Sequence, residues 1–254
     1  MENITLKDQD IIILDKKDTE YNIEVLENSH IQILEYDINN SQVNLKVNNY
    51  ASVKYDVLNI LETNVLRTID LYAASLVKMN TVSLKNVVDN TVVNLIDKYA
   101  SFTLDNLLIL INGKQTITTR TNHNSVSGKS YINNVGVAIK NADIFFDTTG
   151  FVAPQMEKND CRQLSKGIII GDDAHITERP ILLIDNYNVN AYHGASIGKM
   201  SEEQLFYLMS RGIPKKDAFM LILEGLIAPF LENIKDENKR LEVSNTISSM
   251  LEEE

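Results

Sequence analysis

The side chains best suited to metal or interface chemistry are few: four histidines and one cysteine in 254 residues. His193 lies in the run Ala-Tyr-His-Gly-Ala-Ser at 191–196, directly before a helical segment. Its small neighbours leave room for a ligand or another backbone to come close. An imidazole is a common metal ligand and a common interface residue. We therefore take His193 as the candidate metal or interface residue.

The remaining histidines and the cysteine give a weaker signal. Cys161 could bind a metal as a thiolate, but it has no cysteine partner and falls in a charged stretch expected to be flexible, which favours a bystander thiol. His123 is expected to make a structural hydrogen bond, and His30 and His175 are expected to face solvent or turns. Without a His-x-His or Cys-x-x-Cys spacing, the sequence does not predict a self-contained metal site.

The run Ser-Val-Ser-Gly-Lys-Ser at 125–130 resembles part of a phosphate-binding loop. The first glycine of that motif would fall on His123, and the residues after Ser130 alternate like a strand. A phosphate loop needs a helix whose N-terminus faces the anion. The sequence therefore argues against nucleotide binding.

Composition narrows the class of protein. A formal net charge of -11 and a pI near 4.9 argue against a nucleic-acid partner, because phosphate neutralisation requires clustered Lys and Arg. A single cysteine is typical of a reducing compartment, which favours the cytoplasm. No apolar stretch approaches the roughly 20 residues that span a bilayer, and the start lacks a signal pattern, so no membrane association is expected.

A repeat in the first two-thirds of the chain indicates how these residues are positioned. Segments starting at Val43, Val65 and Val93 each read as two short strands joined by a Tyr-Ala-Ser bend, with spacings of 22 and 28 residues. Such spacing is typical of stacked coils. Asn at the corners is expected to adopt left-handed conformations and to form amide ladders between coils. A sandwich is the alternative, but its hairpins usually contain Asn-Gly or Asp-Gly turns, and this chain has only one.

We predict a mainly β protein: a parallel β-helix, or β-solenoid, followed by a small C-terminal α-helical segment. N-terminal strands over 1–35 lead into the solenoid, 36–200 form its core, and 201–254 form the helical segment. The pattern lapses between Phe145 and Ser165, which indicates a connecting excursion.

The C-terminal segment carries strong helix signals. Ser201 and Gln204 form a capping box, and Gly212 with Pro214 ends the first helix. A second helix starts at Pro214, with Pro229 expected to bend or end it, and 235–254 is predicted as a charged third helix.

The first two of these helices carry an apolar stripe with a nearby arginine. We predict that it docks a partner protein, since two short helices cannot bury all of it on the end of a solenoid; the alternative is that it only caps the solenoid. The docking candidates are Leu205, Phe206, Met209, Arg211, Leu221, Ile222 and Leu226.

Several of these elements together resemble a known family. The run from Thr177 to Gly198, with its Asn-Ala-Tyr-His-Gly-Ala-Ser, the run Gln-Leu-Phe-Tyr-Leu-Met-Ser-Arg-Gly-Ile-Pro at 204–214, and residues 218–230 are similar to the C-terminal half of the SufB/SufD family of iron–sulfur cluster assembly scaffolds. Residues 121–130 resemble that family's His-containing strand. The chain resembles SufD more than SufB, because Gly194 follows His193 and Ser165 lies near the position of the family's cysteine.

The resemblance implies a right-handed parallel β-helix that pairs with a SufB-like paralogue or a second copy of itself, and C-terminal helices that dock a SufC-like ATPase. It implies that His193 takes part in cluster assembly at the subunit interface. It also implies a non-catalytic subunit that holds no stable cofactor alone, with an iron–sulfur cluster assembled transiently beside the SufB-like partner. The alternative from the residues themselves is a purely structural interaction module without iron chemistry. A β-helix carbohydrate enzyme is disfavoured, since no aspartates are spaced as a catalytic pair.

Overall fold

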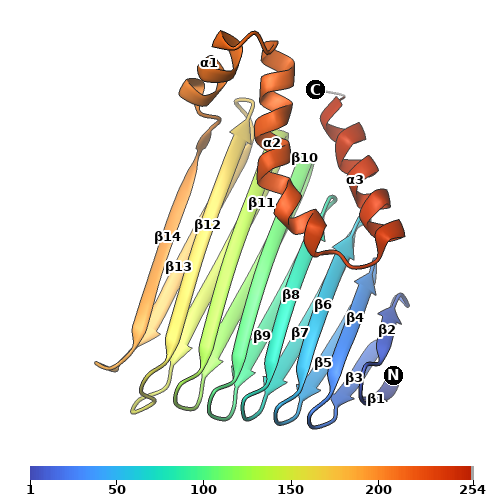
Figure 1. Ribbon diagram of the computed structural model, residues 1–254, viewed down its shortest axis with the longest axis vertical. Helices are drawn as coiled ribbons and strands as arrows, with labels where there is room; N and C mark the ends of the chain where they lie inside the picture. The colour runs from blue at the N-terminus through green and yellow to red at the C-terminus, as the bar shows by residue number, and fades with distance from the viewer. Residues whose placement is uncertain (253–254) are drawn as a thin grey trace.

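A computed structural model describes residues 1–252, and its strands wind into a parallel β-solenoid of about 6 turns followed by three helices (Figure 1). This confirms the predicted fold class. The strands are β1 (Glu2–Leu6), β2 (Ile11–Leu14), β3 (Glu20–Val25), β4 (His30–Tyr36), β5 (Ser41–Val47), β6 (Ser52–Asn59), β7 (Thr63–Leu71), β8 (Leu76–Ser83), β9 (Val87–Leu95), β10 (Ser101–His123), β11 (Lys129–Val152), β12 (Asp160–Ile170), β13 (His175–Ile184) and β14 (Asn190–Lys199).

The solenoid has two walls, formed by alternate strands. One wall runs β1-β3-β5-β7-β9 and the other β2-β4-β6-β8, and both continue into the long strand β10. Strands β10 and β11 contribute their first half to one wall and their second half to the other. After them β12 and β14 extend one wall, and β13 extends the other. Inward-facing Val, Ile and Leu from both walls fill the space between them.

The coils lengthen along the chain. Glu2 lies against Tyr21, Thr63 against Val87, and Asp143 against His175, so one coil grows from 19 to 24 to 32 residues. The spacings of 22 and 28 read from the sequence fall within this range. Lengthening also explains why the repeat fades toward the C-terminal coils, although the coil geometry continues.

The Tyr-Ala-Ser bends are corners of the solenoid, as predicted. Tyr50, Ala74 and Tyr99 occupy equivalent corner positions with left-handed φ of 59°, 52° and 63°. The backbone N–H of Tyr50 donates to the carbonyl of Ala73, and the N–H of Ala74 donates to that of Lys98. These bonds join each corner to the next coil and satisfy backbone groups that would otherwise be unpaired.

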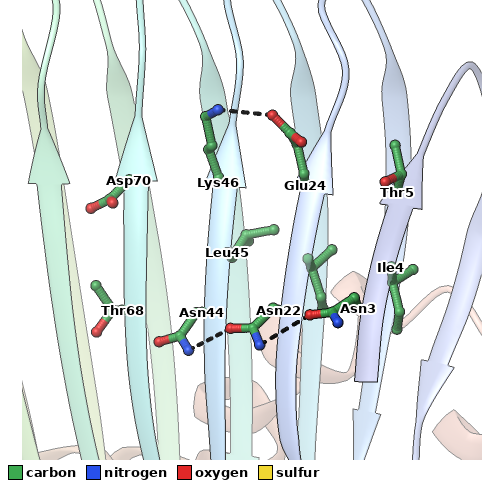
Figure 2. Close-up of a pocket in the computed structure, with 11 residues that line it drawn as sticks. Asn3, Ile4, Thr5, Asn22, Glu24, Asn44, Leu45, Lys46, Thr68 and Asp70 are labelled. Carbon is green, nitrogen blue, oxygen red and sulfur yellow. Dashed lines mark hydrogen bonds and ion pairs between the residues drawn. The ribbon is translucent and has the colours of Figure 1, made fainter. Parts of the chain in front are cut away.

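The predicted amide ladders exist, but they lie within strands and not at corners. Asn44 donates to Asn22 at 2.8 Å and Asn22 donates to Asn3 at 3.3 Å, across the outer face of β5, β3 and β1 (Figure 2). In-register parallel strands place identical side chains one coil apart, which is the geometry that a ladder needs. The surrounding shallow groove has a volume of about 470 Å³, and its lining includes these asparagines and the ion pair of Lys46 with Glu24.

The expected excursion between Phe145 and Ser165 is wrong. Residues up to Val152 continue β11, and β12 begins at Asp160, so only a short corner separates the two strands. Alternation in this stretch buries Phe146 and Thr148 while Asp147 stays half-exposed. The strand pattern was hidden because Phe145 and Phe151 face outward while Thr148 faces inward, which breaks the alternation of apolar and polar residues.

The helices lie against one side of the solenoid. Helix α1 (Glu202–Ser210) has no buried residue, whereas α2 (Lys215–Asn233) buries Leu223, Ile227 and Phe230 against the wall that contains β8 and β10. Helix α3 (Glu237–Glu252) is the predicted third helix and lies toward the earlier coils (Figure 1). Pro229 does not end α2, which continues to Asn233. No helix among residues 1–252 is long and apolar enough to cross a membrane.

Candidate functional site

His193 lies at the open end of the solenoid. Strand β14 pairs with β12 on one side only, and His193 lies in register with Gln163. The side chain of Gln163 is buried inside the solenoid, and side chains at register positions share a face, so His193 is on the inner face of β14. His193 is nevertheless exposed, because no further coil within residues 1–252 covers it.

Both strands of the last coil offer a free edge. Strand β13 pairs only with β11, and β14 only with β12, so one row of backbone groups on each strand is unpaired by the described residues. Unpaired parallel edges are templates for adding another strand. Pro180 in β13 is compatible with this placement, since proline is tolerated on edge strands. The open end can therefore accept a partner.

Glu178 is a functional candidate that the sequence reading missed. It alternates with Ile176 and Pro180 on the inner face of β13, and both of its carboxylate oxygens are buried without a hydrogen-bond partner among residues 1–252. Burial raises the pKa of Glu178 from 4.5 to about 7; the nearby hydroxyls of Ser165 and Thr148 lower it only in part. A charged residue at an inward position of an alternating strand was the signal available in the sequence.

A buried polar network lies deeper in the same end. The Nδ1 of His123 is hydrogen-bonded to the Oδ1 of Asn159 at 2.9 Å, and its Nε2 is hydrogen-bonded to the Oγ of Ser130 at 2.8 Å. The hydroxyl of Ser130 donates to the Sγ of Cys161 at 3.4 Å. Burial lowers the pKa of His123 and raises that of the Cys161 thiol, so neutral forms are favoured. The structural hydrogen bond expected of His123 is present.

The surroundings of Cys161 differ from those expected from the sequence. It is not in a flexible charged stretch but in β12, where its side chain is 1% exposed inside the solenoid. The charges that flank it, Asp160 and Arg162, pair with each other, which keeps them away from the thiol. A buried thiol with a raised pKa is a poor nucleophile.

The predicted docking residues fall into two groups. On α1, Phe206 and Met209 are exposed, Leu205 is half-buried, and Arg211 just after the helix stacks on the ring of Tyr207 at 5.1 Å. On α2, three residues line a cleft of about 460 Å³ beside the end of β14: Leu221, Ile222 and Leu226. Leu221 is exposed, whereas Leu226 also packs against the core under the helix. The structure thus brings part of the stripe next to the strand that carries His193, and leaves Phe206 apart on α1.

The other sequence motifs have structural roles or none. Ser127, inside the run that resembled a phosphate loop, is a left-handed corner at φ 60°, and strand β11 follows it with no helix. His30 and His175 are exposed, as expected. Among residues 1–252, no three His, Cys, Asp or Glu side chains are arranged to hold a metal ion.

Comparison with known proteins gives the family. Residues 8–226 match the family described as SUF system FeS cluster assembly, SufBD core domain. SufD of Bacillus subtilis is 33% identical over 142 residues, which are 55% of this chain and 32% of that protein; SufD of Escherichia coli is 33% identical over 100 residues, 39% and 24% of the two chains. SufB of Bacillus subtilis is 49% identical over 49 residues, 19% and 10%.

The matched region spans a third or less of each of these relatives, while the family match covers most of this chain. The relatives with the longer matches are both SufD, in agreement with Gly194 after His193. The chain therefore belongs to the SufB/SufD core family and, within it, is most like SufD.

Proposed function

We propose that this chain is a non-catalytic scaffold subunit in iron–sulfur cluster assembly. In this function the open end of the solenoid pairs with a SufB-like subunit, or with a second copy, and the α1–α2 region docks a SufC-like ATPase. The observation that carries the proposal is the position of His193: it lies on the inner face of the last strand, beside two free strand edges.

Pairing through the open end is supported by what the last coil exposes. The free edges of β13 and β14 present backbone donors and acceptors. A second solenoid added at this end would satisfy these backbone groups. It would also enclose His193, so that a cluster under assembly there would be shielded from water.

Docking of an ATPase is supported by α1. Phe206 and Tyr207 are 73% and 57% exposed on a helix with no buried residue, which leaves them available to a partner. Because α1 follows β14 after only two residues, movement of α1 would be transmitted to the strand of His193. ATP-driven closure of the ATPase would then open or complete the shared site.

The test uses anaerobic co-expression of the full chain with a SufB-like subunit and a SufC-like ATPase. His193→Ala should preserve co-elution and lower the iron and acid-labile sulfide that co-purify. His175→Ala is the matched control, since His175 is also exposed in the last coil but lies on its outer face. Cluster yield that is equal in both variants would favour the alternative, a structural module without iron chemistry.

The predicted docking surface is tested by a separate variant. Phe206→Asp with Met209→Asp should abolish co-elution of the ATPase while the SufB-like subunit still co-elutes. Tyr50→Asp changes an equally exposed aromatic residue at a distant corner and should alter neither. If the α1 variant retains the ATPase, the docking surface lies elsewhere.

A further inference from the structure

An alternating stack of aromatic and cationic side chains runs along the outer face of the wall that ends in β14. Tyr131 on β11, Arg162 on β12 and Tyr192 on β14 occupy register positions in successive coils. The guanidinium of Arg162 lies 5.0 Å from the ring centroid of Tyr131 and 5.5 Å from that of Tyr192. Both distances are within the range of a cation–π contact. Arg162 therefore lies between two aromatic rings.

The carboxylate of Asp160 holds this stack in place. It accepts two hydrogen bonds from Arg162, each at 2.6 Å, and one from the hydroxyl of Tyr131 at 2.9 Å. A bidentate pair of this kind fixes the orientation of the guanidinium. Tyr192 is thus backed by side chains that are ordered before any partner arrives, which lowers the entropic cost of binding to its ring.

The two walls end this outer face in opposite ways. Tyr192 is 44% exposed, because no coil within residues 1–252 follows β14. On the other wall Arg179 of β13 pairs with Asp147 and lies 5.6 Å from the ring of Phe145, while its side chain remains 59% exposed. The last coil therefore presents an exposed aromatic ring on one wall and an exposed guanidinium on the other.

We propose that Tyr192 and Arg179 select the partner that covers the open end. This partner is a different subunit, which places a lysine or arginine against the ring of Tyr192 and an aromatic ring against Arg179. A second copy that pairs β14 with β14 offers no cation to Tyr192, because the outward positions of that strand, which alternate from Asn190 to Gly198, hold no charged residue. The inference rests on the proposed function and deepens it by choosing a different subunit over a second copy.

The test measures the affinity of the full chain for a purified SufB-like subunit by biolayer interferometry, with substitutions that change the charge at position 192. Tyr192→Ala should weaken binding by at least about fivefold, and Tyr192→Phe, which keeps the ring, should bind like the wild type. Tyr192→Lys should bind more weakly than Tyr192→Ala because it repels the partner's cation, and Tyr192→Glu should bind more tightly than Tyr192→Ala because it attracts that cation. A merely structural role of the ring would not produce this order.

The second wall has its own variant. Arg179→Ala should weaken binding by a similar factor, because it removes the cation from the β13 side of the interface. Tyr187→Ala is the matched control, since Tyr187 is exposed at the corner directly before β14 but lies outside the stack, and it should bind like the wild type. Thermal unfolding of each variant shows that affinities are compared among folded proteins.

Equal affinity of the wild type and Tyr192→Ala, or a Tyr192→Lys variant that binds as tightly as Tyr192→Glu, would overturn selection by charge. The chain alone should elute as a monomer in size-exclusion chromatography, and a dimer would overturn the choice of a different subunit. Failure of the proposed function is read from the wild type itself: a wild-type chain that does not bind the SufB-like subunit refutes the pairing, and not only the role of Tyr192.

Discussion

Two of the solenoid's charged sites are built in opposite ways. In the middle coils the guanidinium of Arg67 is fully buried between the carboxylates of Glu35 and Asp89, and it pairs with both. Tyr55 donates to Glu35 at 2.6 Å and Thr91 donates to Asp89 at 2.8 Å. In the last coil the carboxylate of Glu178 is near the hydroxyls of Ser165 and Thr148, and no cation among residues 1–252 lowers its pKa.

The difference separates structural burial from functional burial. The Arg67 cluster is closed by coils on both sides, so all of its partners must come from the chain itself, and they do. Glu178 lies in the coil that has a free end, where a missing partner can still arrive. A carboxyl that the fold leaves with hydroxyls but no cation at an open edge is therefore not explained by stability alone.

The largest expected effect comes from breaking the closed site. Arg67→Met removes the only cation between two buried carboxylates and should lower the free energy of unfolding by about 3–5 kcal/mol. Chemical denaturation with urea measures it. Lys46→Met is the matched control: Lys46 pairs with Glu24 at 2.8 Å on the surface and should change stability by no more than about 1 kcal/mol. Equal effects in the two variants would contradict the closed-site interpretation.

The helices repeat the contrast between closed and open surfaces. Phe230 on α2 is 4% exposed and Phe206 on α1 is 73% exposed. Phe230→Ala should cost about 3–5 kcal/mol of unfolding free energy through the cavity it leaves, whereas Phe206→Ala should cost no more than about 0.5 kcal/mol. Urea denaturation of both measures this. A large loss in Phe206→Ala would show that α1 packs on its own chain and is not a free docking surface.

The same contrast explains what the sequence could and could not predict. Corners and strands are local, so the bends at Tyr50 and Tyr99 and the capping of α1 by Ser201 were predictable from neighbouring residues. The strand around Phe146 was missed because its coil has lengthened and because Phe145 and Phe151 face outward, which breaks the expected alternation. The role of Glu178 depends on which coil is last and on the register between distant strands, and neither is encoded within a few residues.

Glu178→Gln tests the open site by a gain in stability. The folded-state pKa of Glu178, about 7, lies above its usual 4.5, so the folded chain binds more protons than the unfolded chain between these values. Stability therefore falls as pH rises from 4.5 to 7, and the variant should lack this loss. We expect a gain of about 1–2 kcal/mol above pH 7, since solvent screens part of the shift.

Thermal unfolding of the chain across pH 4.5 to 8 measures the effect. The difference between the variant and the wild type should be near zero at the acid end and should grow toward neutral pH. A variant that is less stable than the wild type at pH 8 would show that the carboxylate has a partner within its own chain, and the contrast with Arg67 would then disappear.

The smallest effect is expected at the outer amide ladder, where paired polar groups are in contact with water. Asn44 donates to Asn22 at 2.8 Å and accepts a hydrogen bond from Gln42 at 3.1 Å. Because water replaces these bonds on unfolding, Asn44→Ala should cost about 0.5–1.5 kcal/mol. Thr68→Ala, the next position in the same row, is the control and should cost less. Urea denaturation measures both, and a loss as large as that of Arg67→Met would mean that coil stacking depends on the surface ladders more than on the closed interior.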